Sequence, residues 1–309
     1  MTFFGARKIL YLLALSLILF GSATADDETP ATITVGSSRI DVLFDPGKLQ
    51  TTQQDLLHWI QNAANAVAAY YGRFPVPHLR LRIIPGNGSG VRGGQTFGMD
   101  GGFIRIRVGS ETTVADLSYD WELTHEMVHL AFPSMADEHH WIEEGLSTYV
   151  EPIARIQTGQ WKAEQMWSDL VRDMPKGQPR EGDQGLDHTH TWGRTYWGGA
   201  LFCFVADVEI RKKTRNRKGL QDALRGILNA GGDIRQDWDL EKALKTGDEA
   251  VGVSVLVPLY HQWKDQPVNA DLTVLWNQLG IAVSNGKVQL RDDAPLASIR
   301  RAITEAKPN

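Results

Sequence analysis

Cysteine is nearly absent from this sequence of 309 residues, which contains only Cys203. A single cysteine excludes an intramolecular disulfide. After residue 20, no apolar run is long enough to span a bilayer. A basic excess is also missing, because 32 Lys and Arg face 37 Asp and Glu, a net charge of −5. We therefore expect no nucleic-acid partner. The hydrophobic fraction of 42% excludes a disordered chain.

The first 25 residues have the pattern of a secretory signal peptide. Arg7 and Lys8 precede a twelve-residue apolar core at 9–20, and a small-residue cleavage site ends at Ala25. Twelve residues are too few for a membrane anchor, and no cysteine follows to carry a lipid. Cleavage would leave 30 basic and 37 acidic residues, a net charge of −7. We predict an exported protein, periplasmic or secreted, with no stable membrane anchor after cleavage.

The first half of the mature chain predicts a sheet with one helix. Residues 32–44 alternate in polarity around a turn at Gly36 and Ser37, and 51–71 have the periodicity of an amphipathic helix. Residues 78–84 and 102–108 alternate as half-buried strands. The glycine-rich segment between them fits no phosphate-binding motif and is expected to be a flexible loop.

From about residue 117 the pattern becomes mostly helical, which predicts an α+β fold instead of a doubly wound sheet. The basic run 211–218 is expected to be a solvated helix end and turn. The expected helices are 117–131, 141–157, 195–213, 217–229 and 238–246. We predict one domain over 26–309, with a sheet lobe at about 31–116, a helical lobe at about 117–285 and a C-terminal extension at 286–309.

The segment WELTHEMVHLAF contains the motif His-Glu-x-x-His, formed by His125, Glu126 and His129. Residues four apart lie on the same side of a helix, so both imidazoles can bind one metal ion. Glu126 lies beside that face, where its carboxylate can activate water. The motif therefore predicts a zinc site.

A second acidic segment, HHWIEEGLSTYVEP, places Glu143 and Glu144 on an expected helix downstream of His129. Two imidazoles and one carboxylate leave a coordination position open, as in catalytic zinc sites. A structural zinc site would more often use several thiolates, and Cys203 is the single one available. The alternative is that these adjacent acids are simply solvated on a helix surface.

These residues resemble the gluzincin zinc metallopeptidases, especially the aminopeptidase N and glycyl aminopeptidase groups. The resemblance lies in His-Glu-x-x-His followed by Trp141, Gly145, Tyr149 and Glu151. It implies a thermolysin-like, two-lobed catalytic core and one zinc ion. It also implies that Glu144, directly before Gly145, is the third zinc ligand, with His125 and His129 as the others. Glu126 would be the general base.

The segment GRTYWGGALFCFVADVEIR resembles the helix start that carries the transition-state tyrosine of the same families. The match implies that Tyr196 stabilises the oxyanion, with Gly199 and Ala200 completing the pattern. His188 and His190 are close enough in sequence to be further candidates for a transition-state contact.

Four features depart from the family pattern. The spacing between His129 and Glu144 is shorter than in aminopeptidase N relatives, and their accessory domains have no counterpart here. Their Gly-x-Met-Glu-Asn signature is replaced by GMDGG at 98–102, where Asp100 is a candidate anchor for a substrate amine. Glu143 stands where those relatives usually carry Asn. The resemblance therefore covers about residues 31–285 and leaves endopeptidase or aminopeptidase action open.

Taken together, these patterns predict an exported zinc peptidase acting on a peptide or protein substrate. Strand 102–108 is the candidate edge strand for pairing with an extended peptide. One alternative is a catalytically silent protein that binds peptides or envelope polymers on the same fold. A second is a structural envelope protein in which the acids and histidines form a hydrogen-bonded core. The oligomeric state stays open.

Overall fold

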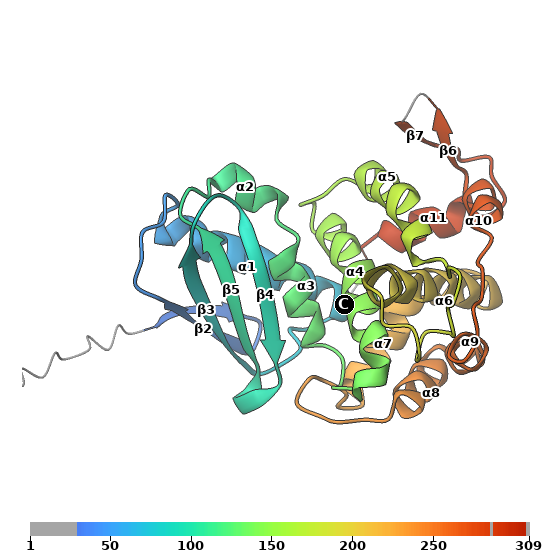
Figure 1. The fold of residues 1–309 in the computed structure, drawn as a ribbon, viewed down its shortest axis with the longest axis horizontal. Coiled ribbons are helices and arrows are strands. Elements are labelled where there is room, and N and C mark those ends of the chain that lie inside the picture. Colours follow the sequence, from blue (N-terminus) through green and yellow to red (C-terminus); the bar gives the residue numbers. More distant parts are fainter. Residues whose placement is uncertain (1–29, 285–286, 307–309) are drawn as a thin grey trace, which may run out of the picture.

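A sheet lobe is followed along the chain by a helical lobe (Figure 1). The computed structural model describes residues 30–284 and 287–306. The predicted signal peptide at 1–25 lies outside the described residues. No helix in those two described ranges is both long and apolar enough to cross a membrane. The mixed sheet and the helices after it confirm the α+β prediction.

The larger sheet of the described chain has the strand order β1-β2-β3-β5-β4. β2 pairs parallel with β3, and β3 with β5, whereas the two outer pairs are antiparallel. The predicted hairpin at 32–44 is confirmed, with Gly36 in its turn at φ 59°. The strands are β1 (Ala31–Val35), β2 (Ser38–Phe44), β3 (His78–Gly86), β4 (Val91–Phe97) and β5 (Phe103–Gly109).

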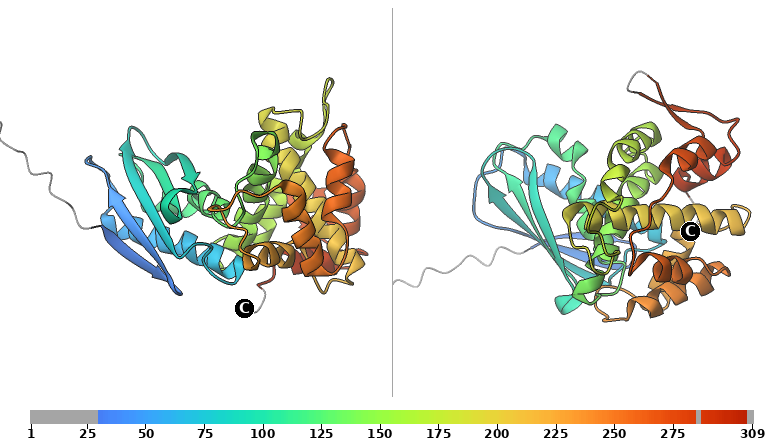
Figure 2. Two further views of the ribbon diagram at one scale, coloured as in Figure 1. Left: turned by 90° about the horizontal axis from the view of Figure 1, so that it is seen from below. Right: turned by 45° about the vertical axis from the view of Figure 1, so that its right-hand side comes forward.

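The predicted helix at 51–71 is α1 (Gln53–Tyr71). Thr52 and Asp55 form a capping box at its start, and Gly72 ends it in the left-handed conformation. Figure 2 shows α1 extending from the sheet lobe towards the helical lobe, where it contacts α3 (Glu122–His129) and α4 (His140–Gln157). Its apolar side therefore joins the two lobes.

The prediction of a flexible loop between residues 86 and 102 is wrong, because this segment contains strand β4. β4 pairs with β5 and forms one edge of the sheet. Residues 102–108 are therefore an interior strand, and the prediction that they form the edge is also wrong. The segment lacks alternating apolar residues because no buried face of β4 demands them. Gly94 must also lack a side chain, since a Cβ there would lie 2.5 Å from Cγ of Glu126.

The helical lobe contains the predicted helices, but 117–131 is divided into α2 (Val114–Tyr119) and α3. Asp120 causes the break: its backbone is extended, and its carboxylate accepts hydrogen bonds from the amides of Glu122 and Leu123. The remaining elements are α5 (Ala163–Asp173), α6 (Gly199–Lys213), α7 (Leu220–Asn229), α8 (Leu240–Val251), α9 (Leu256–Trp263), α10 (Leu272–Leu279), α11 (Ala297–Thr304) and the hairpin β6 (Ile281–Ser284) with β7 (Lys287–Leu290).

Helices α4 and α6 cross at a contact between two glycines. A Cβ on Gly145 would lie 2.3 Å from Cα of Gly199, so neither position has room for a side chain. Further along α6, Asp207 accepts a hydrogen bond from the Tyr149 hydroxyl and pairs with Arg211 at 2.8 Å. Arg211 is buried, so the expectation of a fully solvated basic run is wrong at its first residue. Cys203 lies buried in the same helix.

Candidate metal centre

Helices α3 and α4 bring His125, His129 and Glu144 to one point. One ligand atom from each residue lies within 4.8 Å of the other two. Nε2 of His125 is 3.0 Å from Oε2 of Glu144, and Nε2 of His129 is 3.7 Å from the same oxygen. Among the described residues this is a cluster of histidine and carboxylate groups close enough to hold a metal ion. Its two nitrogens and one oxygen suit zinc and leave a coordination position open.

The local structure explains how the two imidazoles meet. His125 and His129 are one helical turn apart on α3, and their ring centroids are 4.9 Å apart. Asp120 fixes the start of this short helix, as described above. The third group arrives from α4, whose Trp141 is anchored by a 2.8 Å hydrogen bond to Asp187.

The electrostatics of the cluster also favour metal binding. Burial lowers the pKa of His129 to about 3, so its imidazole is neutral near pH 7. Burial acts to raise the pKa of Glu144, but hydrogen bonding to His125 and the nearby His129 and His140 outweigh it and hold the pKa at about 2. A neutral imidazole and an ionised carboxylate are the forms that bind a metal ion.

Glu126 lies beside the cluster and is held by the sheet lobe. The Thr96 hydroxyl, on β4, is 2.5 Å from Oε2 of Glu126. Gly94 packs directly against the Glu126 side chain. Burial raises the pKa of Glu126 above its usual range, an effect that Thr96 partly opposes. A carboxylate whose pKa is raised in this way is suited to exchange a proton near neutral pH.

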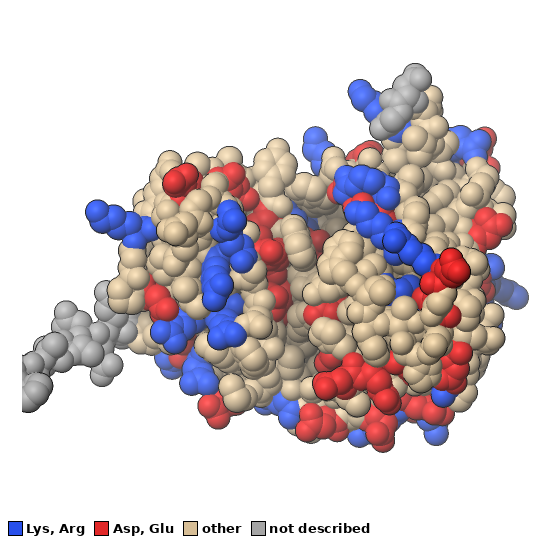
Figure 3. All heavy atoms as spheres, viewed as in Figure 1, with Lys and Arg blue, Asp and Glu red and all other residues tan. Residues whose placement is uncertain are grey.

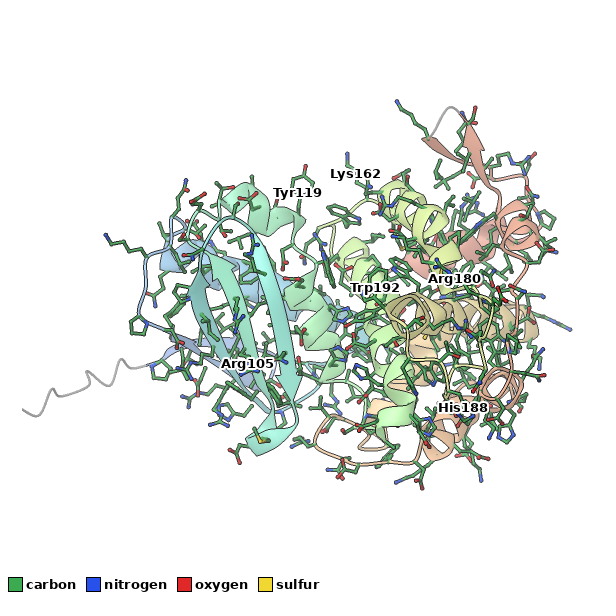
Figure 4. The ribbon with its side chains drawn as sticks, viewed as in Figure 1. Arg105, Tyr119, Lys162, Arg180, His188 and Trp192 are labelled. Carbon is green, nitrogen blue, oxygen red and sulfur yellow. The ribbon has the colours of Figure 1, made fainter. Side chains whose placement is uncertain are left out.

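Tyr196 reaches the same place from a π-helical turn, Gly193–Gly198, directly before α6. Its ring stacks on His125 at a centroid distance of 6.2 Å and on Trp192 at 5.8 Å. Figure 4 labels Trp192 near the boundary between the lobes. Burial and the nearby Glu144 carboxylate raise the pKa of Tyr196 to about 12. The phenol therefore stays protonated near neutral pH and can donate a hydrogen bond.

A cavity of about 670 Å³ surrounds these groups. Figure 3 shows acidic side chains along the boundary of the two lobes, where this cavity lies. The consecutive residues 93–99 line one wall, which means that β4 presents its backbone edge to the cavity. The opposite wall comes from α3, α4 and Tyr196. The lining side chains that the sequence analysis did not single out are Gln95, Thr96, Phe97, Met99, Trp121, Glu122, Ser134, His140 and Ile234.

The remaining candidates divide into those near the cluster and those away from it. Glu143 lines the cavity and accepts a hydrogen bond from the amide of Met135. His188 lies on the helical lobe, away from the lobe boundary, and pairs with Asp265 at 2.9 Å (Figure 4). His190 is exposed and does not line the cavity. Asp100 is also outside it, exposed and paired with Arg80 at 3.1 Å.

Two further side chains of α4, Glu151 and His140, lie near the cluster. Glu151 is buried against Arg155, and burial raises its pKa to about 7. Nε2 of His140 is 3.3 Å from Glu144, one turn before it on α4, and that spacing was visible in the sequence. Thr96 had no such signal, because its role depends on the pairing of β4.

No family model and no curated protein matches this chain. Among solved structures, an M1 zinc metallopeptidase from Deinococcus radiodurans is 13% identical, with a TM-score of 0.52. The match covers 79% of this chain and 52% of that one. An aminopeptidase N family protein from Idiomarina loihiensis is 12% identical, with a TM-score of 0.60, over 83% of this chain and 50% of that one. A Deinococcus radiodurans M1 zinc metallopeptidase mutant bound to a Tyr-Ser-Ala substrate is also 12% identical, with a TM-score of 0.50 over 78% and 52% of the two chains.

This chain therefore spans about half the length of those solved structures. At 12–13% identity, the likeness concerns the arrangement of the backbone. It covers about four fifths of this chain. Over that length, the chain shares the fold of the M1 zinc metallopeptidases and the aminopeptidase N family.

Proposed function

We propose that this protein is a zinc-dependent peptidase with a thermolysin-like catalytic core. The observation that carries the proposal is the convergence of His125, His129 and Glu144 beside Glu126 and Tyr196 in one cavity. The solved structures of the same fold are named as zinc metallopeptidases, and one is described as bound to a tripeptide substrate. When bound, one zinc ion supplies Lewis acidity at this place.

Glu126 is the proposed general base. Its carboxylate accepts a proton from the attacking water and then returns that proton to the leaving amine. Burial keeps the pKa of Glu126 above its usual range, which makes the first transfer, from water to the carboxylate, easier. Thr96 holds one carboxylate oxygen, so the other is the candidate for contact with water.

Tyr196 is the proposed oxyanion stabiliser. Its hydroxyl donates a hydrogen bond to the carbonyl oxygen of the scissile peptide, where negative charge develops during attack. The raised pKa supports this role, because a phenol that stays protonated is a hydrogen-bond donor throughout the pH range of the reaction.

The substrate proposed for this site is an extended peptide bound along β4. No other strand of the described residues pairs with the outer edge of β4, and residues 93–99 line the cavity consecutively. Backbone pairing with such an edge binds a peptide with little regard to its sequence. This mode is compatible with either endopeptidase or aminopeptidase action.

We also propose that the protein acts outside the cytoplasm as a single catalytic domain after removal of residues 1–25. The support is the leader sequence, with its short apolar core and small-residue cleavage site. N-terminal sequencing of the mature protein from fractionated cells tests this: Asp26 is expected first, and retention of Met1 would contradict it.

Mass-spectrometric mapping of cleavage in a mixed peptide library tests the peptidase itself, combined with metal analysis. We expect about one zinc per chain and cleavage that a chelator abolishes. Glu126→Gln should retain zinc and lose hydrolysis, whereas Glu138→Gln, which alters an exposed carboxylate, should match the wild type. Zinc without cleavage would indicate a silent binding protein, and the absence of zinc would indicate a structural hydrogen-bonded core.

A further inference from the structure

The face of the sheet opposite α1 carries a group of arginines. Arg80 and Arg82 project from β3, and Arg105 and Arg107 from β5. Arg82 lies directly opposite Arg105 in the parallel register, a placement of like charges that costs stability. Figure 3 shows a row of basic side chains over this lobe, and Figure 4 labels Arg105 among them. This local charge contrasts with the net negative charge of the chain.

Arg105 and Arg107 of this face, together with Arg92 of β4, surround a cavity of about 260 Å³. Arg105 contacts Gln95 and lies over the Phe97 ring, whereas Arg92 and Arg107 form no ion pair within the described ranges. No acidic residue lines the cavity. The cavity is therefore a concentration of positive charge without a protein counter-charge. Its lining residues are Ile84, Arg92, Gly93, Gly94, Gln95, Arg105 and Arg107.

The arginine cavity and the metal cavity are separated by the thickness of one strand. Gly93, Gly94 and Gln95 of β4 line both. On one side of β4, Thr96 contacts Glu126 beside the metal cluster. On the other side, the neighbouring Gln95 contacts Arg105. The two cavities therefore lie on opposite faces of the sheet at the same edge.

An extended peptide paired with β4 would continue this alternation. Its successive side chains point to opposite faces of the sheet, so one set faces the metal cavity and the other faces the arginines. The metal side carries Glu122, Glu126 and Glu143, which repel an acidic side chain. The arginine side offers planar guanidinium groups that match a carboxylate.

We propose that the cavity between Arg92, Arg105 and Arg107 is a subsite for a carboxylate side chain of a peptide bound along β4. This inference rests on the proposed binding of peptides at the metal centre. The substrates it implies have Asp or Glu at one position, with neutral or basic residues on either side of it. The arginines then act in recognition and take no part in bond cleavage.

The first test is cleavage mapping with the full-length zinc protein, because the scissile bond fixes the register of each peptide. We expect Asp and Glu to be enriched at one position relative to the scissile bond and depleted at the two adjacent positions. The double variant Arg92→Gln/Arg107→Gln should lose this pattern. Arg39→Gln removes an exposed arginine from the same face of the sheet but away from the cavity, and should keep the pattern.

The second test measures binding without catalysis. Fluorescence anisotropy compares peptides that differ by Glu or Gln at one position, using Glu126→Gln protein with bound zinc. We expect Glu to tighten binding by about fivefold to tenfold, less at high salt, with no difference in the double variant. Equal binding of both peptides would overturn the inference.

The two tests separate this inference from the proposed function. Cleavage without an acidic preference overturns the subsite and leaves the peptidase intact. A Glu preference in binding that the double variant loses, in a wild-type protein that cleaves no peptide, supports the subsite and contradicts the peptidase.

Discussion

The two walls of the metal cavity are built in different ways. The wall formed by α3 and α4 presents side chains, with His125, His129 and Glu144 at helical spacing. The wall formed by β4 presents a backbone edge, interrupted by glycines and held in place by β5. Chemistry that depends on side chains is therefore concentrated on one wall, while the other supplies shape and backbone pairing groups. Substitutions on the two walls should therefore impair zinc binding and turnover in different ways.

His129→Ala is expected to have the largest effect. It removes a ligand from the helical wall, so zinc should fall well below one per chain and turnover should fall by at least about 10³-fold. Metal analysis and peptide turnover check this together. His188→Ala removes a histidine far from the cavity and should leave both values unchanged; full zinc occupancy in His129→Ala would contradict the ligand assignment.

Tyr196→Phe is expected to have the second-largest effect on turnover, because it deletes one hydroxyl and no metal ligand. Turnover should fall by about 10² to 10³ with zinc retained, as for a lost oxyanion donor. The measurement is turnover at saturating peptide beside metal content. Wild-type turnover would remove Tyr196 from the mechanism.

Gly94→Ala tests the β4 wall. The new methyl group would lie 2.5 Å from Cγ of Glu126, so the strand or the carboxylate must shift. We expect turnover to fall by about tenfold to a hundredfold while zinc stays bound. Gly86→Ala is the matched control, because a Cβ there meets only an ordinary contact at 3.8 Å. If both variants cleave peptide at the same rate, β4 does not constrain Glu126.

Asp120→Asn should have the smallest effect on turnover and instead change the pH dependence of stability. Burial raises the pKa of Asp120 to about 6, so the folded state holds a proton that the unfolded state loses near pH 4. The wild type therefore loses up to roughly 3 kcal/mol of unfolding free energy as pH rises from about 4 to 6, and the variant does not.

Urea unfolding of both proteins between pH 4 and 8 measures this difference. Subtracting the two curves cancels the contribution of the zinc ligands, which the proteins share. Asp100→Asn alters an exposed carboxylate and serves as the control. A constant difference between Asp120→Asn and wild type across this range would show that Asp120 does not titrate in it.

The contrast between the walls also explains what the sequence could predict. Helix α1, the first hairpin and the ligand-bearing helices follow from local periodicity and turn residues, and these were predicted. Within the metal cluster, the pairing of His125 with His129 follows from their spacing on α3, whereas the choice of Glu144 over Glu143 came from the family resemblance. Each feature that local periodicity predicts is encoded within a few residues of itself.

Features that periodicity along the sequence does not reveal were missed. Strand β4 has no apolar alternation, since its stability comes from pairing with β5. The break at Asp120 depends on a capping carboxylate within an otherwise helical pattern. Thr96 acquires its contact with Glu126 only when the sheet edge lies against α3. The short helices α9, α10 and α11 have too few turns for a clear periodic signal.

The crossing of α4 and α6 has a consequence for how the site can move. Gly145 directly follows Glu144, and Gly199 lies one turn after Tyr196 and at the start of α6. These glycines touch without space for a methyl group. Glu144 on α4 and Tyr196 before α6 are therefore held at a fixed distance from each other by the close contact of the two helices. Any movement between the lobes would therefore carry Glu144 and Tyr196 together, and β4 is the wall left to adjust.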